Sequence, residues 1–439
     1  MRPALRKMFQ RPETNMKSAT TEKLAMHGGE PAVRTPIPAR KRHGELEKQY
    51  LAEVIESDTL FFYLGTKVRE LERRFAELYG KKHCIACSSG TAAVHLAVAS
   101  LQLPPGTEVI TSPITDMGTL SGILYQGLVP VFADVEPDTL NMDAAYVRAA
   151  ITPRTGAIVV VHHAGLAADM DAFLEIGRER RLAVIEDCAQ AFGCEYQGEL
   201  VGRRGSLSTF SLNHFKHITA GSGGLVITDD DRLRYLASLF LDKCYQREEG
   251  IRNPFFLAPN YQMTEMQGAV ALAQLERGAE FVESRWRMGT RLSAQLADVD
   301  GISLQRIRPG GKHSYFLYLF KIEPEKFDCT ADEFASALQH EGVNAKAHLI
   351  TGGRPVYLYD IFQRRSAFPY SRYPFQSLDT GADRTYPPGL CPVAEDAFTR
   401  WITLEVLENY IEENVDEIAL AVTKVAYHLG RRPKAITVQ

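Results

Sequence analysis

The stretch AIVVVHHAGLAADMDAFLEIGRERRLAVIEDC, residues 157–188, decides the fold class of this chain. It contains an apolar run of strand length at 157–163 and a second one at 182–188. Between them, at 169–182, apolar residues recur at intervals of three and four. A strand, a helix and a strand in this order are typical of a parallel sheet with a crossover helix. The sequence therefore predicts an α/β core.

The same alternation continues on both sides of this stretch, from about residue 80 to residue 230. Helical periodicity is present at 91–101, and further strands are predicted at 108–111, 129–135, 207–212 and 224–230. Several of these runs are apolar throughout, as strands covered on both faces are. After a helical segment at 264–286 the pattern becomes mixed, with a strand expected at 315–322 and a helix at 331–342.

The change of pattern predicts three parts. Residues 1–27 are expected to form an N-terminal extension, residues 28–286 a large α/β domain, and residues 287–439 a smaller α+β domain. Within the last part, a segment at about 360–388 is rich in Pro, Tyr, Arg and Ser and lacks periodicity, which indicates a long loop insertion.

The composition excludes several classes of protein. A net charge of −4 over 439 residues gives no reason to expect nucleic acid or a membrane surface as a partner. No apolar run is long enough to span a bilayer, and the first twenty residues lack the apolar core of a secretory signal. Seven scattered cysteines do not form a disulfide framework, and the pair Cys84 and Cys87 has no second pair to complete a metal site. We expect a cytoplasmic protein without a metal.

The stretch FSLNHFKHITAGSGG, residues 210–224, contains the first candidate catalytic residue. Lys216 follows a predicted strand and precedes the glycines 221, 223 and 224. A nucleotide-binding loop of the Walker type has its glycines before the lysine, so the order here disfavours that reading.

Two more stretches contain polar residues at the ends of predicted strands. Asp187 ends the strand 182–188, at the edge where open α/β sheets bind ligands, although it could also cap the next helix. The run SSGT, residues 88–91, precedes a helix and would present free N–H groups to an anion, although an ordinary helix cap has the same appearance.

Together, these three stretches resemble the DegT/StrS family of sugar aminotransferases, a branch of the fold-type I enzymes that depend on pyridoxal 5'-phosphate (PLP). The resemblance runs from about Gly28 to the C-terminal helix. It includes GTKVRELERRFAELYG (65–80), PVFADVEPDTLNMD (130–143), APNYQMTEMQGAVALAQLE (258–276) and CPVAEDAFTRWITLE (391–405). It implies a mostly parallel seven-stranded sheet sandwiched by helices, followed by a smaller C-terminal domain.

The resemblance also implies a role for individual residues. Lys216 would form the internal aldimine with PLP and move the proton, Asp187 would pair with the ring nitrogen, and Gln190 would contact the ring. The phosphate would be bound by Ser89, Gly90, Thr91 and Ser211, and by Asn260 from a neighbouring subunit. The resemblance therefore implies a homodimer with shared active sites.

Some positions depart from the family pattern. Asp116 stands where many relatives have an aromatic residue that stacks on the ring; it would hydrogen-bond the cofactor or substrate, or cap the following helix. Ser222 replaces a common acidic residue and Gln262 a common arginine. His162 and His313 are candidates for substrate contacts, with an ordinary structural role as the alternative.

The implied function is transfer of an amino group from L-glutamate or L-glutamine to a keto group of a sugar nucleotide, a sugar phosphate or a cyclitol. It would proceed by a ping-pong cycle through pyridoxamine phosphate, in amino-sugar biosynthesis. One alternative is a PLP-dependent sugar dehydratase, but such relatives have histidine in place of the lysine. The other is a PLP-binding regulatory protein without turnover, which only Asp116 and Ser222 favour.

Overall fold

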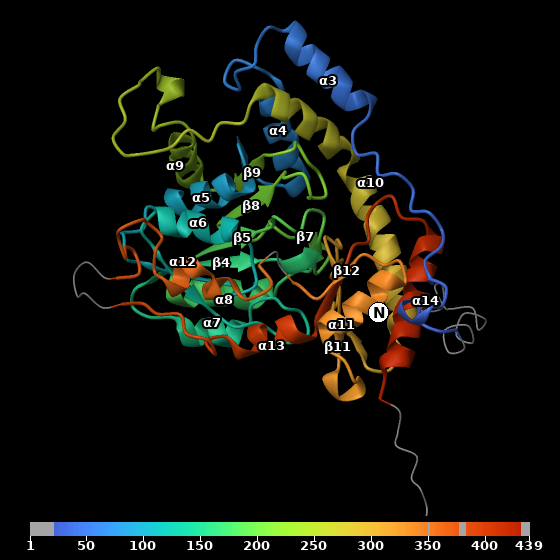
Figure 1. The fold of residues 1–439 in the computed structure, drawn as a ribbon. Coiled ribbons are helices and arrows are strands. Elements are labelled where there is room, and N and C mark those ends of the chain that lie inside the picture. The colour runs from blue at the N-terminus through green and yellow to red at the C-terminus, as the bar shows by residue number, and fades with distance from the viewer. Residues whose placement is uncertain (1–21, 350–351, 377–382, 432–439) are drawn as a thin grey trace, which may run out of the picture.

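The computed structural model describes residues 22–349, 352–376 and 383–431, and its core is a seven-stranded sheet (Figure 1). The strands are β1 (His83–Cys87), β2 (Glu108–Thr111), β3 (Val129–Phe132), β4 (Thr155–Val161), β5 (Ala183–Asp187), β8 (Leu207–Ser211) and β9 (Gly224–Thr228). Their order is β1-β9-β8-β5-β4-β2-β3. Only β9 runs antiparallel to its neighbours. The predicted α/β fold with a mostly parallel seven-stranded sheet is confirmed.

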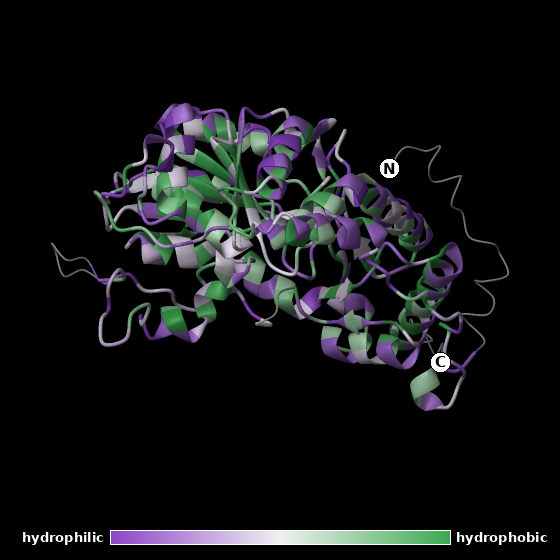
Figure 2. Cartoon of the chain, turned by 90° about the horizontal axis from the view of Figure 1, so that it is seen from above, coloured by the Kyte–Doolittle hydropathy of each residue, from purple (hydrophilic) through white to green (hydrophobic). Residues whose placement is uncertain are grey.

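Helices enclose this sheet on both faces. One face is covered by α5 (Gly90–Ser100), α6 (Met117–Tyr125) and α9 (Asp231–Leu241). The other is covered by α4 (Lys67–Tyr79), α7 (Ala144–Ala150), α8 (Met170–Arg180) and the first part of α10 (Glu265–Leu296). Figure 2 shows the hydrophobic strands lying between these helices. Neighbouring residues of β4 point into different cores, Val159 into one and Val160 into the other, as the two-residue period of a strand requires.

The register of the central strands brings polar residues to one edge. In β5, Asp187 pairs with Val161 of β4 on one side and with Thr209 of β8 on the other, and both pairings are parallel. The carboxyl ends of all three strands therefore lie together. This is the edge at which open α/β sheets bind their ligands.

The C-terminal part has its own antiparallel sheet. Its strands are β10 (Ile302–Leu304), β11 (Tyr318–Ile322), β12 (Ala345–Lys346) and β13 (Trp401–Leu404), in the order β10-β11-β13-β12. Helices α11 (Ala331–His340) and α14 (Glu412–Leu429) pack against it. The strand expected at 315–322 begins only at Tyr318, because the N–H groups of Ser314 and Leu317 bond instead to the carbonyl groups of Gly165 and Ala164.

The helix α10 joins the two parts. It is one helix of 32 residues that begins with a capping box at Thr264, and the predicted domain boundary after residue 286 lies inside it. At the other end of the chain, Leu24 and Ala32 pack into the core of the C-terminal sheet. Residues 1–21 of the predicted extension lie outside the described residues. The division into domains stays a prediction.

The predicted insertion at 360–388 packs on the edge strand β3. It includes the short helix α12 (Asp360–Gln363). The aromatic rings of Phe362 and Tyr386 contact Phe132, and the Tyr386 hydroxyl donates to the Pro130 carbonyl at 2.8 Å. These contacts cover an otherwise open sheet edge. Residues 377–382 of this insertion lie outside the described residues.

The remaining elements are short or peripheral. They are α3 (Glu45–Glu56), α13 (Pro392–Arg400), the hairpin of β6 (Glu195–Tyr196) and β7 (Glu199–Leu200), and the 3-10 turns Ala25–His27, His163–Gly165, Arg247–Glu249, Pro324–Lys326 and Val356–Leu358. Within the described ranges, no helix has both the length and the apolar character needed to cross a membrane.

Candidate active site

Lys216 lies in the turn between β8 and β9, next to an aromatic ring. Its Nζ is 4.3 Å from the centroid of the Phe316 ring. Burial lowers the pKa of Lys216 below its ordinary value, and the carboxylates of Asp187 and Asp116 act in the opposite direction. A lysine held in this way loses its proton more easily than a solvated one. The amine is therefore suited to act as a base.

Asp187 is buried at the end of β5 with few partners. Its Oδ2 accepts a hydrogen bond from the Thr119 hydroxyl at 2.7 Å, and its Oδ1 accepts one from the Ala189 N–H at 3.1 Å. Burial raises the pKa of Asp187, although the bond from Thr119 and the charge of Lys216 pull it down. A carboxylate in this state gains from a further cationic partner.

The start of α5 forms a close-packed turn beside Ser211. The Ser89 hydroxyl caps the helix by accepting from the Ala92 N–H at 3.1 Å, so the N–H groups of Gly90 and Thr91 are left without partners inside the helix. A Cβ atom at Gly90 would lie 2.6 Å from the Cβ of Ser211. Only glycine lets the two segments approach this closely, and the result is a cluster of donors suited to an anion.

Asp116 stands at the start of α6 in the position of its cap. Its Oδ1 accepts from the Gly118 N–H at 2.8 Å, and the side chain is exposed. A Cβ atom at Gly118 would lie 2.9 Å from the Thr91 hydroxyl oxygen, so the first turns of α5 and α6 meet. Asp116 therefore caps α6, and its predicted hydrogen bond to the cofactor or substrate stays a prediction.

Gln190 and Ser222 are bound to the main chain around the site. The Gln190 Oε1 accepts from the Ala164 N–H at 2.7 Å, which leaves its amide nitrogen as the group that can donate to a ligand. The Ser222 hydroxyl donates to the Ser88 carbonyl at 2.9 Å. The serine that departs from the family pattern thus ties the glycine-rich loop to the turn that precedes α5.

Asn260 is not brought to the other site residues within one chain. It is exposed, its Oδ1 accepts from the Gln262 N–H at 3.3 Å, and its backbone forms an isolated bridge with Asp242. The next residue, Tyr261, accepts a bond from the Ser88 N–H at 2.7 Å. The segment thus passes beside the start of α5 while the Asn260 side chain stays at the surface.

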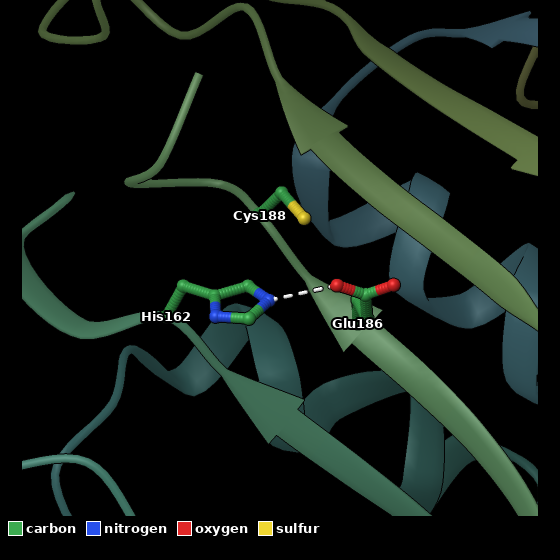
Figure 3. Close-up of side chains that lie close together, drawn as sticks. All are labelled: His162, Glu186 and Cys188. Carbon is green, nitrogen blue, oxygen red and sulfur yellow. Dashed lines mark hydrogen bonds and ion pairs between the residues drawn. The ribbon is translucent and has the colours of Figure 1, made fainter. Parts of the chain in front are cut away.

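His162 belongs to a buried polar cluster on the opposite face of the sheet from Asp187. Figure 3 shows its ring directed at Glu186, and the Nε2 to Oε2 distance is 3.0 Å. Its Nδ1 accepts from the Ala168 N–H at 3.1 Å, so both ring nitrogens are used inside the fold. Glu186 and Asp187 are neighbours in β5, and neighbouring residues of a strand point to opposite faces of the sheet. His162 bonds to Glu186, so the structure does not bring it together with Asp187 and Lys216.

The same cluster has the donor types of a metal site. Ligand atoms of His162, Glu186 and Cys188 all lie within 4.8 Å of one another. The Glu186 carboxylate, however, already accepts from His162 and from the N–H groups of residues 202, 204 and 205. Burial raises the pKa of Cys188 well above its ordinary value, so this sulfur is a neutral thiol beside the hydrogen-bonded pair. The hydrogen bonds account for the cluster as part of the core.

His313 is also buried away from Lys216. Its ring stacks on Tyr315 with centroids 4.1 Å apart, its Nε2 bonds to the Gln305 amide oxygen at 3.1 Å, and its Nδ1 accepts from the Tyr315 N–H at 2.9 Å. It borders a separate cavity of about 950 Å³ beside α10 and the segment 304–311. As with His162, the structure does not bring His313 into the cluster around Lys216.

Sequence reasoning missed two residues that contact the central pair. Thr119 bonds to Asp187, and Phe316 lies against Lys216. Thr119 had a weak signal, because a hydroxyl one turn into α6 faces the same strand end as the helix start. Phe316 had none, because its contact depends on how the C-terminal part packs on the large sheet.

Comparison with known proteins gives one consistent result. A model of the DegT/DnrJ/EryC1/StrS aminotransferase family matches residues 41–423. The GDP-perosamine synthase of Caulobacter vibrioides is 36% identical over 301 residues, which are 68% of this chain and 80% of that protein. A putative L-glutamine:3-amino-2,3-dideoxy-scyllo-inosose aminotransferase of Streptoalloteichus tenebrarius is 32% identical, over 92% of this chain and 98% of its own.

A solved structure agrees with these relatives. The crystal structure of 3-amino-5-hydroxybenzoic acid synthase has a TM-score of 0.77 and 28% identity to this chain, and the match covers 89% of this chain and 98% of that one. Since the family model spans most of the sequence and the fold agrees with it, this chain belongs to the DegT/DnrJ/EryC1/StrS family of PLP-dependent aminotransferases.

Proposed function

We propose that this protein transfers an amino group from L-glutamate or L-glutamine to a keto group on a sugar nucleotide, a sugar phosphate or a cyclitol. The observation that carries the proposal is the convergence of Lys216, Asp187 and the start of α5 at the carboxyl end of the sheet. Two relatives support the acceptor class by name, since one is named for GDP-perosamine and the other for L-glutamine and a scyllo-inosose.

The residues at this edge fit PLP. The N–H groups at Gly90 and Thr91, with the hydroxyls of Ser89 and Ser211, would hold its phosphate. The buried carboxylate of Asp187 would pair with the protonated ring nitrogen. Burial raises the pKa of Asp187 because it disfavours the ionised form, and a cationic partner would stabilise that form. When bound, PLP withdraws electrons from the carbon atom that loses or gains a proton.

The protein side chains would then supply the remaining chemistry. Lys216 would take a proton from the α carbon of the amino donor in the first half-reaction and deliver a proton to the former keto carbon of the acceptor in the second, because burial lowers its pKa. Thr119 would keep the Asp187 carboxylate oriented. The amide nitrogen of Gln190 would donate to the ring oxygen, since its Oε1 is already bonded to Ala164.

We further propose a homodimer in which each site receives Asn260 from the partner subunit. Exposed apolar side chains support a second copy as the partner: Leu257 is 94% exposed, Leu64 70% and Phe255 62%. The two parts of the chain meet nearby, because Arg247, eight residues before Phe255, lies over the ring of Phe61, three residues before Leu64. Apolar surface of this kind marks protein interfaces.

The shared site can be tested with Asn260→Ala. Losing one hydrogen bond to the phosphate should weaken PLP binding roughly tenfold to a hundredfold, by about 1.5–3 kcal/mol. The exposed Asn253 offers a matched control, and Asn253→Ala should bind PLP as the unaltered protein does. At a PLP concentration too low to load Asn260→Ala alone, mixing Asn260→Ala with Lys216→Ala subunits should restore one complete site per heterodimer. An active monomer, or a mixture without activity after verified exchange, would refute the shared site.

The proposed reaction has two halves that can be measured separately. Addition of PLP should give the protein an absorbance band in the near ultraviolet or visible, and L-glutamate or L-glutamine should convert it to the spectrum of pyridoxamine phosphate. A screen of keto-sugars and keto-cyclitols against that form, with mass detection of the aminated product, identifies the acceptor. A protein that acquires no band with PLP contradicts the proposed function.

A further inference from the structure

One arginine far from Lys216 in sequence binds the turn that contains it. The Arg42 guanidinium donates to three main-chain carbonyl groups, those of His214, Lys216 and His217, and the bond to His217 measures 2.9 Å. Arg42 is buried and lies 174 residues before the lysine. One side chain therefore binds the main chain before, at and after Lys216.

The other bonds of this turn are made by its N–H groups, including one from the His214 N–H to the Gly221 carbonyl at 3.0 Å, and by the His217 ring, which donates to the Ser314 carbonyl at 2.9 Å. The turn lies between β8 and β9, and Asn213, His214 and Phe215 are exposed. Local bonds run from the Lys216 N–H to the Asn213 carbonyl at 2.9 Å and from the Phe215 N–H to the Asn213 side chain at 3.1 Å. The bond to the His217 carbonyl is buried and the other two are partly buried, so leaving these carbonyl groups without a donor is costly and the guanidinium stabilises this particular conformation.

Arg42 faces a carboxylate on its opposite side. Its Nε lies 3.8 Å from the Glu408 carboxylate, which also pairs with Arg40 and Arg285. Its own carbonyl accepts from the Gln274 amide at 2.8 Å. Burial, followed by the charge of Arg40, lowers the pKa of Arg42 to about 10, so it remains a cation at neutral pH. The donor is therefore charged and fixed in place.

The contact reaches Lys216 through the main chain. The groups that set the pKa of the Lys216 amine are its burial and the carboxylates of Asp187 and Asp116. The hydrogen bonds of the Arg42 guanidinium go to main-chain carbonyl oxygens of the turn and not to the amine. The effect of Arg42 on the amine would therefore be one of position.

We propose that Arg42 is a positioning residue that fixes the turn 213–218 and so aims the Lys216 amine at the cofactor. The inference rests on the proposed function of Lys216, and it assigns a specific task to the chain segment that precedes α3. The charge-assisted bonds to three carbonyl groups explain why a buried arginine is needed there, since lysine cannot present the same fork of donors.

Hydrogen exchange of the full-length protein tests the structural half of this proposal without PLP. Arg42→Met should speed amide exchange in a peptide covering 213–218 by about tenfold or more, because the turn then opens locally. Arg40→Met is the matched control: it removes an arginine from the same Glu408 carboxylate but no contact to the turn. Its exchange at 213–218 should stay near that of the unaltered protein. Equal exchange in the two variants overturns the proposal.

Attachment of PLP to Lys216 tests the aim of the amine. After borohydride reduction, the modified fraction of Lys216, measured by peptide mass, should rise more slowly in Arg42→Met than in Arg40→Met, and Arg42→Lys should lie between them. If Arg42→Met does not fold, Arg42→Lys and Glu408→Gln carry both measurements, and exchange at 213–218 unchanged in both overturns the proposal. An unaltered protein that never attaches PLP refutes the proposed function instead, and the exchange result still decides the role of Arg42.

Discussion

Two neighbouring carboxylates on β5 occupy opposite faces of one sheet and have opposite properties. Glu186 accepts from His162 and three main-chain N–H groups; burial raises its pKa, but these bonds outweigh it and hold the pKa below the ordinary value. Asp187 accepts from Thr119 and one N–H, and burial leaves its pKa raised. Fully bonded carboxylates serve the fold, whereas Asp187 keeps capacity for a ligand. The site lies on the less saturated face.

The largest effect is expected from the lysine that shares a face with Asp187. Lys216→Ala should abolish amino transfer, because no other group would supply the base, while the fold and the PLP phosphate contacts remain. Turnover with both amino donors and the thermal unfolding midpoint check this. Substantial residual turnover in a preparation free of unaltered enzyme would refute the assignment.

The next effect separates the two carboxylates by activity. Asp187→Asn should lower turnover on the order of a hundredfold, because the nearly isosteric amide cannot stabilise a protonated ring nitrogen. PLP occupancy should fall much less, since the phosphate contacts persist. Parallel measurement of turnover and bound PLP decides, and normal turnover would mean that another group pairs with the ring.

The complementary variant on the other face should act on stability. In Glu186→Gln the amide nitrogen would replace one of the two carboxylate oxygens and so face two donors. These would be the His162 ring and the Gly202 N–H at one oxygen position, or the N–H groups of residues 204 and 205 at the other. Breaking a buried pair in this way should cost about 3 kcal/mol or more. Urea unfolding measures the loss, while turnover per folded molecule should stay close to that of the unaltered protein. A turnover loss as large as that of Asp187→Asn would remove the distinction between the faces.

The distinction also explains how far the sequence alone could predict the molecule. The strands and Asp187 were predictable because apolar runs and short motifs are local in sequence. Thr119 bonds to Asp187 across 68 residues and Arg42 to Lys216 across 174, so a local pattern gives only a weak signal for Thr119 and none for Arg42. His162 ends a predicted strand, which leaves both a substrate contact and a structural role open; only the register of β4 against β5 reveals that it faces Glu186.

The smallest expected effect concerns His163, a buried ring beside the same strand end. Neither of its ring nitrogens has a hydrogen-bond partner among the described residues, and burial lowers its pKa to about 4 from 6.5. Below about pH 6.5 the unfolded chain binds a proton at this histidine, whereas the folded protein does so only near pH 4. The free energy of unfolding is therefore highest above about pH 6.5 and falls as the pH drops toward 4. Between pH 7 and 5 the loss should be about 2 kcal/mol. The free energy of unfolding of His163→Leu, measured in urea, should depend less on pH by this amount. An unchanged pH dependence would contradict the lowered pKa of His163.

The most direct measurement locates the lysine that binds the cofactor. The protein is incubated with PLP, reduced with borohydride and digested, and the modified peptide is identified by mass. The account predicts the phosphopyridoxyl group on Lys216, and addition of L-glutamate or L-glutamine before reduction should diminish this labelling as the cofactor leaves the lysine. Labelling of a different lysine, or labelling of Lys216 that neither amino donor diminishes, would contradict it.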